Sequence, residues 1–194
     1  ALLAMHGLFD TQQSIEPDEM RRAAGAWLAD QPFLVAIGYS ERVPRAGLEA
    51  FEARVRAEGP VADFKVFDRT EAGPLDSDTE VLAIRYIEPL EPNRRALGVN
   101  QLSIPAAREA IGRLLVRGGV AATAGFRLTQ GQAGEVGIVL YQPLWRGEPA
   151  TEPQRRQAAG QSTLHQLGGR VVGKGRGHWA HKGADLSPAR RRQS

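Results

Sequence analysis

The chain has 194 residues, of which 42% are hydrophobic, and it carries a formal net charge of +3 and no cysteine. This length suits one ordinary domain with its own core, whereas a disulfide framework, a cysteine-ligated zinc site and a span of roughly 20 apolar residues across a bilayer are all excluded. Residues 154–194 contain nine Lys and Arg and one acidic residue, which gives this segment a net charge of +8 and leaves −5 for residues 1–153. Any binding of nucleic acid or of another anion would therefore rest on the C-terminal segment alone.

The first part of the chain alternates between expected helices and strands. Residues 1–12 are apolar at their start and read as the end of a helix that enters from upstream. A second helix begins near Pro17, which suits a first helical turn, and stops at Gln31-Pro32. Residues 33–43 are rich in apolar and aromatic residues and predict a strand. Another helix runs from Pro44 to the Gly59-Pro60 stop.

The middle of the chain continues this alternation. Residues 63–68 predict a strand, and residues 81–87 form a nearly unbroken apolar run, which is typical of a strand covered on both faces. A turn follows, and residues 96–100 are expected to return as a short strand. The next helix begins at Ser103 and Pro105 and ends at Gly118-Gly119.

Residues 121–129 and 135–145 predict two strands joined by a five-residue loop that contains glycine. Such a hairpin is antiparallel, so a purely parallel, doubly wound sheet is not expected. The predicted fold class is mixed α/β, of the α+β kind, with an antiparallel central sheet. After Pro153 the chain has seven glycines, nine basic residues and little periodicity, so we expect irregular structure there.

The motifs of catalysis and metal binding are weak in this chain. The stretch 168–175 fits GxxxxGK, but Gly175 stands where a phosphate loop needs Ser or Thr. His178 and His181 lack accompanying carboxylates or cysteines. Residues 1–153 hold one histidine, His6, and no GxSxG elbow. We therefore expect no enzyme, no metal and no cofactor.

Several short sequence strings occur in a characteristic order along the chain. They are VAIGYSERV (35–43), LEAFE (48–52), YIEPLEPN (86–93), ALGVN (96–100), REA (108–110), the glycine pair 118–119, Ala122-Thr123 and the apolar strand through Tyr141. In order and spacing, over residues 8–150, they resemble the CHASE family of extracytoplasmic sensor domains found in receptor histidine kinases and diguanylate cyclases.

This resemblance implies a PAS-like antiparallel sheet flanked by helices, with the end of an N-terminal stalk helix in residues 1–13 and the sensor domain in residues 14–150. It also implies a small-molecule ligand, a homodimer formed through the stalk, and flanking transmembrane helices with kinase or cyclase output domains in the parent protein. The basic Gly/Arg-rich residues 151–194 have no counterpart in the resemblance. We expect this segment to be foreign to the domain, through a shifted reading frame or a truncation.

The resemblance also points to ligand-binding residues. Plant members bind cytokinins through an Asp on the adenine edge and a Thr that acts through water, and these positions correspond to Glu88 and Thr123. Arg85, Tyr86 and Arg127 could line the same cavity. Glu88 is longer than the plant Asp, and Asn100 stands where many bacterial members have Asp, so cytokinin itself is not the expected ligand.

Each of these residues also has an explanation that involves no ligand. Glu88 would also suit a strand end in water or a pair with Arg85 or Arg127, and a strand threonine such as Thr123 needs no ligand. Two classes of function therefore stay open: a sensor with a ligand between the sheet and its covering loops, and a nucleic-acid or anion binder that acts through the basic segment.

Overall fold

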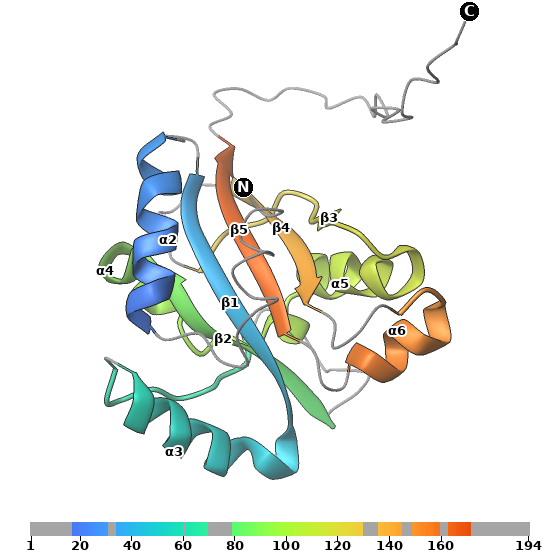
Figure 1. Ribbon diagram of the computed structural model, residues 1–194, viewed down its shortest axis with the longest axis horizontal. Helices are drawn as coiled ribbons and strands as arrows, with labels where there is room; N and C mark the ends of the chain where they lie inside the picture. Colours follow the sequence, from blue (N-terminus) through green and yellow to red (C-terminus); the bar gives the residue numbers. More distant parts are fainter. Residues whose placement is uncertain are drawn as a thin grey trace, which may run out of the picture.

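The computed structural model describes residues 17–30, 34–59, 61–69, 79–129, 136–144, 149–159 and 163–171. At its centre lies a five-stranded sheet in the order β2-β1-β5-β4-β3 (Figure 1). All pairings between these strands are antiparallel. The prediction of an α+β fold with an antiparallel central sheet is confirmed.

Strands β1 (Leu34–Pro44) and β2 (Glu80–Glu88) form one end of the sheet. Their register places Tyr39 opposite Tyr86 but Ser40 opposite Ile84, so Arg85 is an extra residue on β2. A bulge of this kind breaks the alternation of side chains along a strand. As a result Arg85 and Tyr86 lie on the same face of the sheet, and the Arg85 guanidinium stacks 5.0 Å from the centre of the Tyr86 ring.

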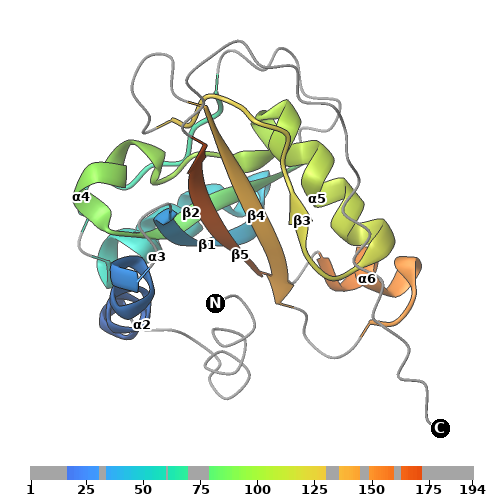
Figure 2. The ribbon, with the colours of Figure 1, turned by 90° about the horizontal axis from the view of Figure 1, so that it is seen from above.

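Helices cover both faces of the sheet (Figure 2). On one face lie α2 (Pro17–Asp30) and α3 (Leu48–Glu58), which follows a short 3-10 turn, η1 (Arg45–Gly47). Ala24 of α2 packs with Ile37, and Phe51 of α3 packs with Val43. Both contacts join an apolar helix stripe to an apolar strand face, which removes both from water.

The opposite face carries α5 (Pro105–Arg117) and the connection that leads to it from β2. That connection contains α4 (Leu90–Asn93) and the 3-10 turns η3 (Arg94–Ala96) and η4 (Gln101–Ser103). The buried stripe of α5 consists of Ala107, Ala110, Ile111 and Leu114. This stripe and the sheet form the larger apolar core, as the helical spacing of the stripe predicts.

The C-terminal part of the domain is β3 (Ala121–Ala122), β4 (Val136–Leu144), α6 (Glu152–Ala159) and β5 (Thr163–Val171). The predicted hairpin is present as the antiparallel pair of β3 and β4, although β3 is much shorter than predicted. The loop residues 130–134 lie outside the described residues.

The structure corrects the expectation of irregular structure after Pro153. Strand β5 pairs along its length with β1 on one side and with β4 on the other, so residues 163–171 are a central strand of the sheet. The sequence of β5 contains Gly168, Gly169 and polar residues, and therefore lacks the apolar alternation that identifies a strand. The backbone hydrogen bonds to β1 and β4 stabilise β5 as a strand although its residue pattern does not predict one.

Residues 63–68 and 96–100 are also less regular than predicted. They form isolated bridges rather than strands: Phe67 pairs with Val99, and Asn100 pairs with Ala83 of β2. Gly98 explains this close crossing, because it has a φ of +81° and an added Cβ would lie 2.0 Å from the carbonyl oxygen of Lys65.

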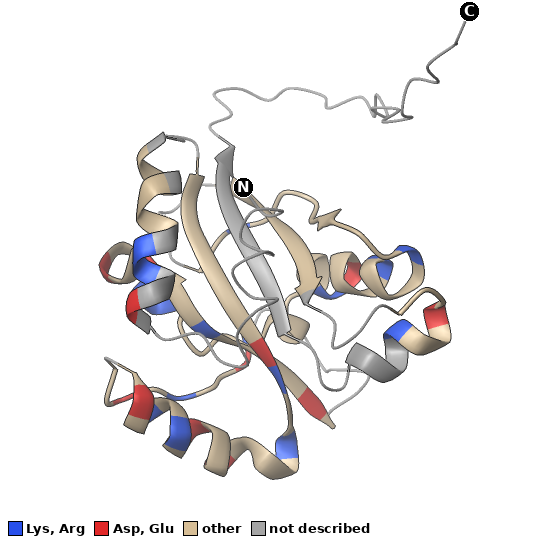
Figure 3. Ribbon diagram, viewed as in Figure 1, with Lys and Arg blue, Asp and Glu red and all other residues tan. Residues whose placement is uncertain are grey.

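The stalk helix predicted for residues 1–13 lies outside the described residues. Among the helices that are described, none is both long enough and apolar enough to cross a membrane. Charged residues are present along α3 and near the ends of β1 and β2, whereas β4 contains none (Figure 3).

Candidate ligand-binding site

A partly open hollow lies between the sheet and the segments that cover its α5 side. We call it the α5-side hollow. Its floor consists of strand residues: Ala36, Gly38, Ile84, Ile87, Val139 and Tyr141. Its cover comes from the β2–α5 connection and from the segment after β3: Ala96, Val99, Gln101, Ile104, Phe126, Leu128 and Thr129. The hollow therefore joins segments far apart in the sequence.

The lining of the α5-side hollow is apolar and uncharged. Gln101, Thr129 and Tyr141 supply the polar atoms, and no Asp, Glu, Lys or Arg is among the described residues that line it. Tyr141 is 1% exposed, and its burial raises the pKa of the phenol, so the group stays neutral.

Gln101 is the polar group in this hollow that stands out. Its side chain is 2% exposed, and no described residue places a hydrogen-bond donor within reach of its Oε1. A buried carbonyl oxygen without a partner costs roughly 1–3 kcal/mol of stability. The oxygen is enclosed by its neighbours and does not open into the hollow.

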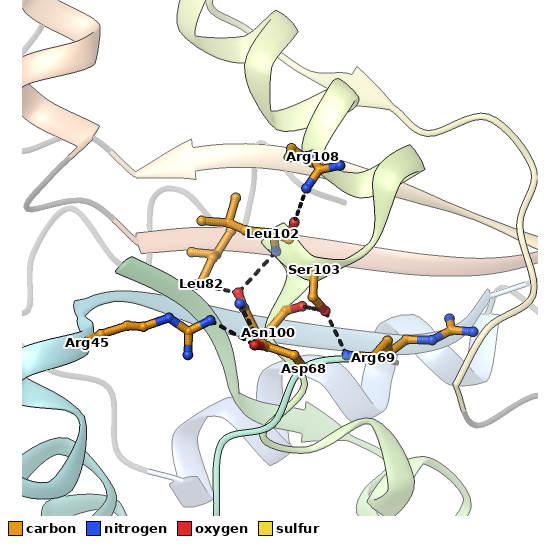
Figure 4. Close-up of polar contacts among 8 residues, drawn as sticks. All are labelled: Arg45, Asp68, Arg69, Leu82, Asn100, Leu102, Ser103 and Arg108. Atoms are coloured by element: carbon orange, nitrogen blue, oxygen red, sulfur yellow. Dashed lines mark hydrogen bonds and ion pairs between the residues drawn. The ribbon is translucent and has the colours of Figure 1, made fainter. Parts of the chain in front are cut away.

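Asn100 fixes the backbone beside Gln101. Its Oδ1 accepts hydrogen bonds from the N–H groups of Leu82 (2.9 Å) and Leu102 (3.1 Å), and its Nδ2 donates to Asp68 Oδ1 (2.7 Å) (Figure 4). The side chain is completely buried. One amide therefore joins β2, the turn η4 and the segment before residue 70.

Ser103 fixes the other end of η4. Its Oγ donates to the carbonyl oxygen of Asn100 at 2.6 Å and accepts from the N–H of Arg69 at 2.9 Å (Figure 4). The Arg45 guanidinium in turn holds Asp68 Oδ2 at 2.8 Å. Because both flanks of the turn are anchored, the position of Gln101 over the hollow is determined by the fold.

A second hollow lies on the other face of the sheet between α2, α3 and β2. We call it the α3-side hollow. Three of the predicted site residues meet here because of the β2 bulge: Arg85, Tyr86 and Glu88. Most of the remaining lining is apolar: Val55, Val61, Phe64, Ile87, Leu90 and Leu97.

Arg85 is engaged by acidic partners. Its Nη1 donates to Glu41 at 2.9 Å, and its Nη2 donates to Glu58 on α3. Burial alone would lower the pKa of Arg85, but Tyr86 and the two carboxylates together raise it above its usual value. The guanidinium therefore stays charged and ties α3 to the sheet.

Glu88 ends β2 with a side chain that is 17% exposed, and its partner is Arg21 of α2 at 3.7 Å. Burial raises the pKa of this carboxyl group, although Arg21 and the N–H of Leu90 act in the opposite direction. Glu88 thus joins β2 to α2, and it does not line the α5-side hollow.

Thr123 and Arg127 lie away from both hollows. The Thr123 hydroxyl accepts the N–H of Val139 at 2.9 Å, and the Thr123 N–H donates to the Val139 carbonyl at 2.9 Å. Arg127 is exposed, and its carbonyl oxygen accepts from Arg69 at 2.8 Å. The five predicted residues therefore do not form one site.

Gln101 is not among the residues predicted from the sequence. Its signal was modest: a glutamine in the otherwise mostly apolar stretch 96–104, directly after Asn100. The histidines at 178 and 181 and residues 172–175 of the GxxxxGK stretch lie outside the described residues. Within the described ranges, no cluster of three or more His, Asp or Glu side chains could hold a metal ion.

The family model described as CHASE domain matches residues 13–173 of the chain. The match extends through α6 and β5, which the sequence analysis placed outside the domain. No curated protein matches the chain.

Proposed function

The chain belongs to the CHASE domain family, the extracytoplasmic sensor domains of signalling receptors, and from this premise we propose that it senses a small molecule in the α5-side hollow. The observation that carries the proposal is the hollow itself, a partly open, apolar space between the sheet and its covering segments. Pockets with mostly apolar walls and a few polar atoms are typical of small-molecule sites.

The topology supports a way for binding to be transmitted. The floor of the hollow contains residues of β1 and β4, and β5 lies between these two strands. A ligand that favours one spacing of β1 and β4 would therefore bias β5, whose far end leads to the C-terminal part of the chain. Such a ligand shifts a population by its different affinity for the two arrangements.

The five residues that the resemblance suggested have separate roles in this proposal. Thr123 and Arg127 lie on the segment that supplies Phe126 and Leu128 to the cover of the hollow. Glu88, Arg85 and Tyr86 lie on the opposite face of β2, where their contacts with α2 and α3 would report a movement of that strand.

The proposal extends to the parent protein. We propose a membrane-anchored receptor at the periplasmic or extracellular face, with a histidine kinase or diguanylate cyclase output domain, that pairs as a homodimer through the stalk. In such a receptor this domain binds and signals and has no catalytic step of its own. Support for this comes from the family alone.

A thermal-shift screen of small metabolites with paired variants tests the proposal. Val139→Phe fills the hollow, whereas Val136→Phe makes the same change on the same strand at a side chain that is 45% exposed. We expect a hit to raise the Tm of the original protein and of Val136→Phe, and to leave Val139→Phe unchanged. A hit that stabilises all three proteins equally would place the ligand elsewhere and refute the proposal.

A further inference from the structure

We infer that the apolar N-terminal segment of this chain, residues 1–9, docks on the face of β4 that points away from the α5-side hollow. We call this surface the back face of β4, and it consists of Val136, Ile138 and Leu140. The contact joins two parts of one chain and does not depend on any ligand.

The back face of β4 is apolar and only partly covered. Val139 and Tyr141 line the α5-side hollow, and because side chains alternate along a strand, the residues between and before them point to the other side of the sheet. On that side α2 and α3 lie over β1 and β2, and no described helix lies over β4 (Figure 1). Val136 is 45% exposed, and neither Val136 nor Ile138 belongs to an apolar cluster of the described residues.

The strand register makes the back face a continuation of the surface that α2 covers. Leu140 of β4 and Ile37 of β1 lie in one row across the sheet, because both are opposite the same residue of β5. Ile37 packs with Ala24 of α2, and Leu140 packs at the margin of that cluster. In the next row Ile138 lies opposite Gly169, which has no side chain to cover its neighbours. Further burial at this place would therefore extend an existing apolar contact.

The composition of the N-terminal segment matches this surface. Residues 1–9, ALLAMHGLF, contain seven apolar residues and no Asp, Glu, Lys or Arg, and β4 is likewise without charge. The helical spacing predicted for the segment places Leu2, Met5 and Phe9 on one side. An apolar stripe of this kind is stabilised by burial against an uncharged surface, because no charge has to lose its water.

The segment is also close enough to reach the back face. Residues 10–16 connect it to the start of α2 at Pro17, and seven extended residues span up to about 23 Å. Pro17 lies roughly 10 Å along the helix from Ala24, and β4 lies two strand spacings, about 10 Å, from β1. So short a connection gives the segment a high effective concentration, which favours it over a separate molecule as the occupant.

The contact places the segment directly behind the proposed ligand site, because the two faces of β4 belong to alternate residues of one strand. The stalk pairing proposed for the parent receptor would draw on the same residues. The test therefore has to separate a contact within one chain from a contact between two chains.

A nitroxide label on the segment tests the docking by NMR. The chain has no cysteine, so His6→Cys provides a single attachment site and spares the apolar side chains. We expect the label to erase the amide signals of Ile138 and Leu140 and to leave those of α3 intact. If the signals of β4 survive, or if β4 and α3 lose their signals equally, the inference is overturned.

Paired substitutions in the labelled chain separate docking from mere proximity. Met5→Ser with Phe9→Ser removes apolar side chains from the segment, whereas Gln12→Ser with Gln13→Ser makes two changes in the connecting residues. The first pair should restore the signals of β4 and lower the Tm by several degrees, and the second pair should change neither. Persistence of the signal loss or of the original Tm in the first pair would contradict the inference.

A mixed sample distinguishes the two possible sources of the segment. Nitroxide-labelled chains at natural isotope abundance are mixed with unlabelled, isotope-enriched chains, so that only contacts between molecules change the spectrum. We expect the signals of Ile138 and Leu140 to remain in this mixture. Their loss would mean that a second copy covers the back face, which would overturn the contact within one chain and leave the proposal for the α5-side hollow untouched.

Discussion

Asn100 shows what a single buried amide does in this domain. Its oxygen accepts two backbone N–H groups while its nitrogen donates to Asp68 Oδ1, so both ends of the side chain are used. A carboxylate could take over the first role but not the second. The identity of this residue is therefore coupled to the carboxylate at position 68.

Asn100→Asp should be destabilising at pH 7, by about 2 kcal/mol, because it places a buried carboxylate at position 100 against the carboxylate of Asp68 and removes the hydrogen bond between them. Urea unfolding measures the change. The like charge raises the pKa of the pair in the folded state, so stability should return as the pH falls and be lost as the pH rises through that pKa. Asp68→Asn in the same chain should restore most of the loss at pH 7. An Asn100→Asp variant as stable as the original protein at pH 7 would contradict this account.

The free energy of unfolding should also depend on pH through the carboxyl group of Glu88. Burial holds the pKa of its carboxyl group above the usual value of about 4.3, despite Arg21 and the N–H of Leu90. The folded state therefore binds this proton more tightly than the unfolded state does. The resulting stability is present below about pH 4 and is lost as the pH rises through the raised pKa.

Glu88→Gln removes this dependence, because an amide does not titrate. Relative to the original protein, the variant should become more stable as the pH rises from about 4 towards 7, by no more than about 1 kcal/mol since Arg21 is exposed and its interaction is screened. Urea unfolding over that pH range measures the difference, with Glu91→Gln at an exposed neighbouring position as the control. A difference that stays constant with pH would rule out this assignment.

At the scale of elements, the side chain of Arg155 connects α6 to the end of α5. Arg155 is 9% exposed and donates from Nε to the carbonyl oxygen of Leu115 at 2.9 Å, from Nη1 to Ala150 at 2.6 Å and from Nη2 to Val116. The last carbonyls of a helix have no partners within the helix. Arg155 satisfies two of them on α5 and thereby positions the segment that enters β5.

Replacing this arginine should loosen α6. Arg155→Met keeps much of the apolar stem and leaves the three carbonyl oxygens without the guanidinium, so we expect a loss of about 2–3 kcal/mol in urea unfolding. Arg117→Met, at an exposed arginine in the same last turn of α5, is the matched control and should change stability by less than about 0.5 kcal/mol. Equal effects of the two substitutions would show that the hydrogen bonds of Arg155 are not what holds α6.

At the scale of the whole molecule, the sheet depends on its C-terminal strand. β5 lies between β1 and β4, and the strand order has no other link between the β1–β2 pair and the β3–β4 pair. Without β5, β1 and β4 would each present an unpaired strand edge. The domain consequently extends to residue 171, and the expected boundary at residue 150 is wrong.

Two truncations test this boundary. A chain that ends at Val171 should keep its circular dichroism spectrum, its cooperative unfolding and any ligand-induced rise in Tm, whereas a chain that ends at Ala159 should not fold cooperatively. The first truncation also removes six of the nine basic residues of the C-terminal segment. If it lost all affinity for ligands and the full chain bound nucleic acid strongly, the alternative function through the basic segment would be favoured over the sensor.

The sequence by itself determined those parts of the fold whose pattern is local. The apolar run of β2, the stripe of α5 between Pro105 and Gly118, and the β3–β4 hairpin are all visible in residue spacing, because burial on one or both faces imposes that spacing. The order of the short strings was also enough to indicate the family. These features need no knowledge of what each element packs against.

Only the tertiary structure decided the place of β5 and the position of the site. β5 has little apolar pattern of its own and is a strand because two neighbours supply its hydrogen bonds. One extra residue in β2 places Tyr86 on the same face as Arg85, opposite the α5-side hollow. Gln101 became notable only when distant segments closed over it and left its oxygen unpaired. Which strands pair, which face of the sheet a side chain lies on, and whether a buried polar atom finds a hydrogen-bond partner all depend on contacts between distant segments. The spacing of residues along one segment does not encode them.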